Sequence, residues 1–195
     1  MPKLPAHALV PLSGSLSALL FENPRAGVVR DVYWSVSVQF APIRYGAPGK
    51  EQEFDCEVTT EWLRLGLRDW RGLGGVSLDG GPEIASSFCV AEHEPAIETH
   101  LRVSGREGAT FLVDLDLRVA FHGFFGEDAD PALPVSAHLR VPFEGVKVHA
   151  GLLKPAPGGD AEALALLAPF VDVSAFSGLV TQTNQFKVST FVLVP

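Results

Sequence analysis

The chain has 195 residues, a length that one large all-β domain can account for, and its formal net charge is −8. No run of basic residues occurs, so the electrostatic footprint of a nucleic-acid-binding protein is absent. The mean hydropathy is +0.21 and only 19% of the residues are charged. This composition predicts apolar surface beyond one filled core, and we expect an oligomer interface, a ligand cavity or a protein partner to cover it.

Membrane contact and secretion are not expected. The longest apolar runs, residues 16–21 and 163–171, end well before the ~20 residues that a membrane helix needs. The N-terminal segment has neither a clean apolar stretch nor a small-x-small cleavage site. Cys56 and Cys89 lie outside any C-x-x-C arrangement, which favours buried free thiols over a disulfide. Together these features predict a cytoplasmic protein.

In the first half of the chain, hydrophobic alternation predicts strands separated by turns. Residues 31–40 alternate strictly, which is typical of a half-buried strand. A second strand begins near residue 54, and its apolar parity shifts beyond Thr60, which favours a β-bulge at residues 59–61. Residues 71–82 contain five glycines and are interpreted as a flexible connection. A strand is expected at residues 84–91, followed by a turn at residues 93–95.

The second half continues the strand pattern and adds one helix. Strands flank a hairpin turn at residues 104–108, and two more, 135–143 and 146–153, are expected to be joined by a tight turn. Residues 160–168 form the one credible helix, with Asp160 as a cap and Pro169 as a stop. A last strand is expected at residues 185–194. We therefore predict a single all-β domain over residues 1–195, an antiparallel β-sandwich or partly open barrel with one short helix near the C-terminus.

Three of the expected strands place polar side chains on one side and apolar side chains on the other. If the strands are adjacent, their polar sides form one sheet face. On that face we expect His100 beside Asp114, directly opposite or on the diagonal, and a carboxylate in that position can make an imidazole a general base. An ordinary solvated face with cross-strand ion pairs is the alternative. The candidate polar face comprises Glu98, His100, Arg102, Asp114, Asp116, Arg118, His122, His138 and Arg140.

Local motifs for metal binding or nucleophilic catalysis are missing. No H-x-H or H-x-x-x-H pair anchors a metal, so every ligand pairing would have to come from tertiary structure. His93 and Glu94 begin like H-E-x-x-H, but Pro95 and Ile97 break that pattern. The sequence therefore predicts no metal and no cofactor.

A second candidate surface combines indole and guanidinium groups. Trp62 and Trp70 lie close in the sequence to three arginines, Arg64, Arg68 and Arg71, and such groups stack at partner surfaces. Stacking at an ordinary domain surface is the alternative.

The leading functional hypothesis is a non-catalytic cytosolic protein that binds another protein or self-associates through excess apolar strand surface. The apolar last strand, residues 185–194, adds to this expectation and predicts a homo-oligomer. The alternative is an enzyme or a small-ligand binding protein that uses the polar face. A concave polar face favours the alternative, and a polar face turned to bulk water favours binding. The sequence alone does not decide whether the chain is an enzyme.

Overall fold

The computed structural model describes residues 9–45, 49–90, 92–120 and 132–195. Strands dominate, with short 3-10 turns and one α-helix between them. The strands are β1 (Pro11–Asn23), β2 (Val28–Tyr45), β3 (Gln52–Leu63), β4 (Ser77–Gly80), β5 (Ser86–Val90), β6 (Glu92–Glu107), β7 (Thr110–Val119), β8 (Leu133–His149), β9 (Gly178–Thr183) and β10 (Ser189–Val194). The helices are α1 (Asp160–Leu167) and the 3-10 turns η2 (Pro24–Ala26), η3 (Trp70–Gly75), η5 (Ala150–Leu152) and η6 (Val173–Ala175).

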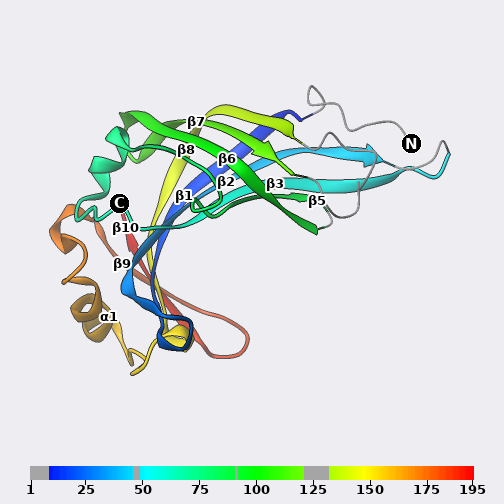
Figure 1. Cartoon of the computed structure of the whole chain (residues 1–195). Coiled ribbons are helices and arrows are strands. Elements are labelled where there is room, and N and C mark those ends of the chain that lie inside the picture. Colours follow the sequence, from blue (N-terminus) through cyan, green and yellow to red (C-terminus); the bar gives the residue numbers. More distant parts are fainter. Residues whose placement is uncertain (1–8, 46–48, 91, 121–131) are drawn as a thin grey trace.

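Seven strands close into a barrel, and the protein is 61% strand (Figure 1). The order around the barrel is β1-β2-β3-β5-β6-β7-β8, and a parallel pairing of β8 with β1 closes it. All the other pairings are antiparallel. Strand β4 adds to the edge of β6, and β10 and β9 extend the sheet beyond β8. The all-β prediction is confirmed, including the short helix near the C-terminus.

Strand β8 exchanges partners along its length. Its first half pairs with β7, and its second half lies between β1 and β10. At Gly145 one extra residue enters the ladder to β1, and the backbone φ there is +110°. A Cβ at this position would overlap the carbonyl oxygen of Leu193, so the site requires glycine. The prediction of two strands joined by a tight turn is thus wrong, because residues 144 and 145 form a bulge within one strand.

A bulge also explains the shift of apolar parity in β3. Two steps along β2, from Trp34 to Val36, span three steps along β3, from Leu63 back to Thr60. Trp62 lies inside this bulge with φ of +61°, an uncommon backbone conformation for a non-glycine residue. The predicted bulge is present, one or two residues further along the chain than expected.

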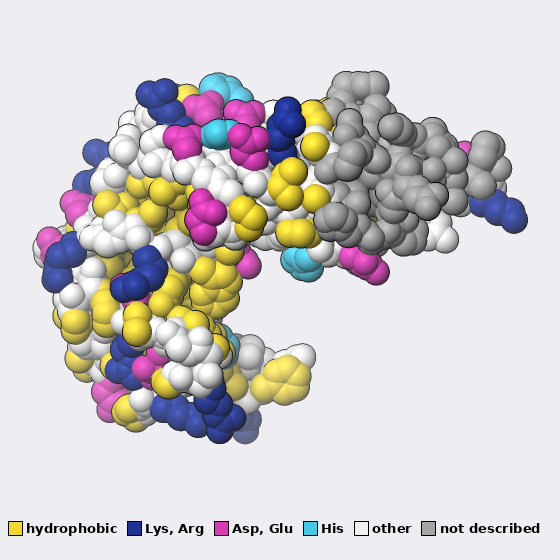
Figure 2. Space-filling view, in the orientation of Figure 1, with side chains coloured by type: hydrophobic (Ala, Val, Ile, Leu, Met, Phe, Trp, Pro, Cys, Tyr) yellow, Lys and Arg dark blue, Asp and Glu magenta, His cyan; other side chains and the backbone are white. Residues whose placement is uncertain are grey.

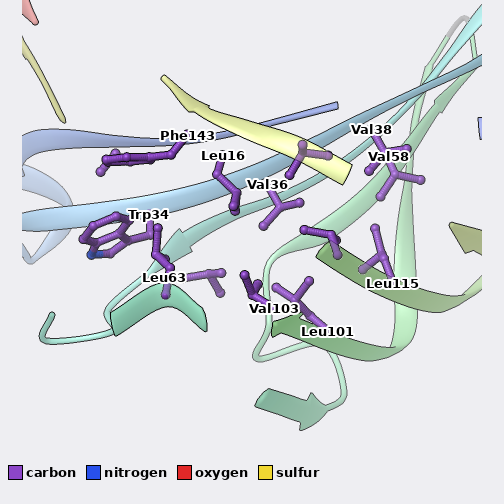
Figure 3. Close-up of a cluster of buried hydrophobic side chains, with 14 of the residues drawn as sticks. Leu16, Trp34, Val36, Val38, Val58, Leu63, Leu101, Val103, Leu115 and Phe143 are labelled. Atoms are coloured by element: carbon purple, nitrogen blue, oxygen red, sulfur yellow. The ribbon is translucent and has the colours of Figure 1, made fainter. Parts of the chain in front are cut away.

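The barrel interior is filled with apolar side chains from every wall. Figure 3 shows side chains of β1, β2, β3, β6, β7 and β8 converging on one another, among them Trp34 and Phe143, whose rings stack at 5.6 Å. The indole of Trp70 from η3 also stacks on the ring of Phe143, at 5.6 Å between the ring centres. The Nε1 of Trp70 donates a hydrogen bond to the carbonyl of Ala175. Trp34, Phe143 and Trp70 therefore form a buried stack of aromatic rings in the core.

Below the barrel, β1, β2 and β8 run on and, with β10 and β9, form a curved extension (Figure 1). Helix α1 covers one side of this extension, and its buried residues Ala163 and Leu167 belong to the same apolar core as the barrel. Figure 2 shows the resulting hook shape, with a hollow on the side opposite α1. The outward faces of β1 and β2 therefore line that hollow.

Three further sequence expectations need correction. The glycine-rich segment 71–82 contains most of η3 and all of β4, because Leu73 is anchored in the core and residues 77–80 pair with β6. Residues 93–95 are not a turn but pair with β5 within β6. Strand β10 begins only at Ser189, and its apolar side chains are buried between β8, β9 and the core. That strand is therefore not the free apolar surface expected from the sequence.

Candidate functional site

The predicted polar face exists as the outer surface of β4, β6, β7 and β8. Opposite His100 of β6 stands Asp116 of β7, and Asp114 lies on the diagonal. Asp114 in turn stands opposite Arg102 on one side and His138 of β8 on the other. Eight of the nine predicted residues share this face, at positions 98, 100, 102, 114, 116, 118, 138 and 140, and His122 lies outside the described residues.

Most of the charges on the polar face are paired with a partner across the strands. His100 Nδ1 bonds to Asp79 Oδ1 at 2.6 Å, and its Nε2 bonds to Glu98 Oε1 at 3.3 Å. The second oxygen of Glu98 lies 3.4 Å from Arg118 Nε. A direct hydrogen bond joins His138 Nδ1 to Asp114 Oδ1.

Arg140 completes the set of pairs, with its guanidinium 3.0 Å from the carboxylate of Glu107. Arg102 and Asp116 have no ion-pair partner among the described residues. Asp79 and Glu107 are partners that sequence reasoning missed. The alternation of Ser77, Leu78 and Asp79 was a usable signal of the short strand β4, but the flanking glycines concealed it.

These pairs are exposed to water. The side chain of His100 is 49% exposed and that of His138 is 72% exposed. The hydrogen bond that His100 donates to Asp79, followed by the one that it donates to Glu98, raises the pKa of His100 above its ordinary value of 6.5. Exposed pairs of this kind contribute little to stability, typically ~0.2–1 kcal/mol each.

Two shallow depressions lie along the polar face, of about 360 Å³ and 480 Å³, and His100 and Asp116 border both. Both depressions open widely to solvent. No group of three or more His, Cys, Asp or Glu side chains within the described ranges could hold a metal ion. The face can bind and release protons, but it offers no enclosed site in which a substrate would be desolvated.

The predicted tryptophan and arginine surface is divided by the fold. Trp70 is only 4% exposed, so its ring is unavailable to a partner. The guanidinium groups of Arg71 and Arg106 lie 5.0 Å and 5.6 Å from the centre of this ring. This is stacking within the domain, the alternative to stacking on a partner. Arg68 donates to the carbonyls of residues 168 and 169. Trp62, Arg64, Arg68 and Arg71 are all exposed, but only Trp62 still offers an indole ring to a partner.

Around Trp62 the structure reveals an aromatic cluster that the sequence did not. The ring of Trp62 lies 5.0 Å from that of Phe21 and 5.7 Å from that of Tyr33, which are themselves 6.4 Å apart. Tyr33 is buried, and its hydroxyl donates to the carbonyl of Val29 at 2.8 Å. Trp62 is 46% exposed. We call Phe21, Tyr33 and Trp62, on the outer side of β1, β2 and β3, the aromatic face.

The two cysteines are free thiols, as expected, but only Cys56 is buried and Cys89 is partly exposed. Cys56 points into the core, and burial raises its pKa to about 11. Cys89 stands opposite Glu57 on the other side of the sheet, so the two sulfurs cannot bridge. Burial, with the nearby Glu57 carboxylate, also raises the pKa of Cys89. Neither thiol is activated as a nucleophile.

Comparison with protein-family models, with curated proteins and with solved structures gives no match. No helix in the described part of the chain is long and apolar enough to cross a membrane.

Proposed function

We propose that the protein is a non-catalytic cytosolic binding protein whose partner contact is the aromatic face, and that a second copy of the chain is the partner. The observation that carries the proposal is Trp62, a half-exposed indole on a β-bulge, packed against two further rings. Aromatic side chains with one buried and one exposed side are enriched where proteins bind one another.

The uncharged part of β1 and β2 next to the aromatic face favours contact between two copies. A chain of net charge −8 repels its own copies wherever acidic side chains meet. Beyond the aromatic rings, the outer side of β1 and β2 carries uncharged serines, Ser15, Ser17, Ser35 and Ser37. The charges beside Trp62 are mixed: Arg64 and Asp31 form an ion pair at 2.9 Å, and Glu61 and Glu83 border the same depression as Trp62. A second copy that binds here must therefore keep these two carboxylates away from its own.

The polar face supports the alternative, an enzyme or small-ligand site, less well. Its histidines are half or more exposed, and its depressions are shallow. A polar face turned to bulk water favours the hypothesis that the protein binds a partner through another surface. An activity or ligand affinity that is lost in both His100→Ala and Asp114→Asn would reverse this ranking.

The test is light scattering of the purified chain over a concentration series. We expect a species heavier than 20.9 kDa whose fraction rises with concentration. Trp62→Ser should shift it towards the monomer. Ile97→Ser is the matched control, because Ile97 is 43% exposed and lies at a β-bulge on β6, and it should leave the series unchanged. A single species of 20.9 kDa at every concentration contradicts the proposal.

A further inference from the structure

The lower end of the hook gathers three segments that are far apart in the sequence. They are the β1–β2 turn with its flanks, residues 22–30; η5 with its flanks, residues 149–155; and the β9–β10 turn, residues 184–189 (Figure 1). Arg30 donates to the carbonyl of Lys154 at 3.0 Å, which ties the first segment to the second. Val188 packs on Gly151, which ties the second to the third.

This end of the molecule is basic although the chain is acidic. The three segments carry four cations, Arg25, Arg30, Lys154 and Lys187, and one acid, Glu22. Glu22 forms an ion pair with Arg30, with 2.5 Å between Oε1 and Nη2. Arg25, Lys154 and Lys187 have no acidic partner within the described residues. Figure 2 shows the gathering of Lys and Arg side chains at the bottom of the hook. We call these segments the basic tip.

The basic tip also exposes large apolar side chains. Phe186 is 76% exposed, Val29 is 54% exposed and Leu152 is 43% exposed. Leu152 borders a surface pocket of about 370 Å³ together with Arg25 and Lys154, so apolar and cationic groups are neighbours here. Three of the eight exposed large apolar side chains in the described residues are thus at one end of the molecule.

The turn that presents Phe186 is held by hydrogen bonds. The side-chain oxygen of Asn184 accepts from the backbone N–H groups of Phe186 and Val188 at 2.9 Å and 3.0 Å. The backbone of Asn184 also bonds to Lys187 and Val188. A ring projected by such a turn is already ordered in the free protein, so little conformational entropy remains to be lost when it is buried.

From this combination we propose that the basic tip docks on an anionic lipid surface, with Phe186 and Leu152 entering the interfacial region and the cations facing the headgroups. Charge complementarity and apolar side chains at one end of a chain are what peripheral membrane binding requires. The cations are scattered along the sequence, which is why no membrane contact is expected from the sequence alone. The inference does not depend on the proposed partner contact, because it uses a different set of residues.

The test is vesicle flotation of the full chain. Vesicles of phosphatidylcholine with roughly a third phosphatidylserine should carry the protein upwards, and vesicles of phosphatidylcholine alone should not. The bound fraction should fall as salt is raised, because salt screens the attraction. Equal binding to both kinds of vesicle, or binding to neither, overturns the proposal.

Two variants locate the contact. Arg25→Glu with Lys187→Glu should weaken binding by at least about tenfold. Arg44→Glu with Lys50→Glu makes the same change of charge near the other end of β2, about 50 Å along the strand, and should leave most of the binding intact. Phe186→Ser should also weaken binding, whereas Leu12→Ser, 62% exposed in β1, should not. Equal losses in the tip variants and their controls contradict docking through the basic tip.

Discussion

The polar face and the aromatic face are outer surfaces of the same barrel, yet they are built in opposite ways. On the polar face, charged side chains such as His138 and Arg140 are exposed and bond to one another over a well-packed core. On the aromatic face, Tyr33 is buried on the outer side of the sheet by the rings of Phe21 and Trp62. Charge alone is therefore no evidence of a functional surface, because exposed ion pairs are the usual way to solvate a sheet.

The largest expected difference between the faces is in stability. Tyr33→Ala removes a buried ring from two aromatic neighbours and should lower the free energy of unfolding by about 3 kcal/mol. Tyr33→Phe removes only the hydroxyl bond to Val29 and should cost about 1 kcal/mol. Urea denaturation of the two variants measures both values. Equal costs would mean that the ring packing contributes nothing.

Trp62 allows a finer test, because its backbone and its ring act in opposite directions. Trp62→Ala should lower the free energy of unfolding by ~1–2 kcal/mol through lost ring contacts. Trp62→Gly should cost about 1 kcal/mol less than the alanine variant, because glycine accepts a φ of +61° without strain. The comparison is again made by urea denaturation. A glycine variant less stable than the alanine variant would show that the bulge stores no strain.

On the polar face the same measurement should yield much smaller effects. Arg118→Ala and Arg140→Ala each break one exposed pair and should change the free energy of unfolding by no more than about 1 kcal/mol. A cost of several kcal/mol from either variant would mean that the polar face is a tightly coupled network and would weaken the contrast.

The smallest expected effect is a change in the pKa of His100. Asp79 and Glu98 raise the pKa of His100, so its contribution to stability is present below pH 6.5 and is lost as the pH rises through the raised pKa. Asp79→Asn should move the pKa of His100 down towards 6.5, as measured by NMR titration of the imidazole protons. Asp114→Asn should leave His100 almost unchanged, because Asp114 bonds to His138. The opposite pattern would contradict the observed strand register.

The alternation of apolar and polar residues was sufficient to predict the β class. It also placed residues 98, 100 and 102 on one face with 114, 116 and 118, because successive side chains of any strand point to opposite faces of the sheet. It was not sufficient to find the partner of His100, since Asp79 belongs to a four-residue strand between glycines. The aromatic face was hidden for a different reason. Trp62 owes its position to a bulge, and Phe21 and Tyr33 come from strands whose register only the closed barrel defines.

Hydrogen–deuterium exchange of the intact chain at low and high protein concentration is the sharpest test of self-association through the aromatic face. Protection at high concentration should rise in residues 17–23, 31–37 and 59–65, which carry the aromatic face. Residues 98–102, 114–118 and 136–140 on the polar face should not change. Added protection on the polar face, or no change in either face, would mean that the aromatic face is not the contact between copies.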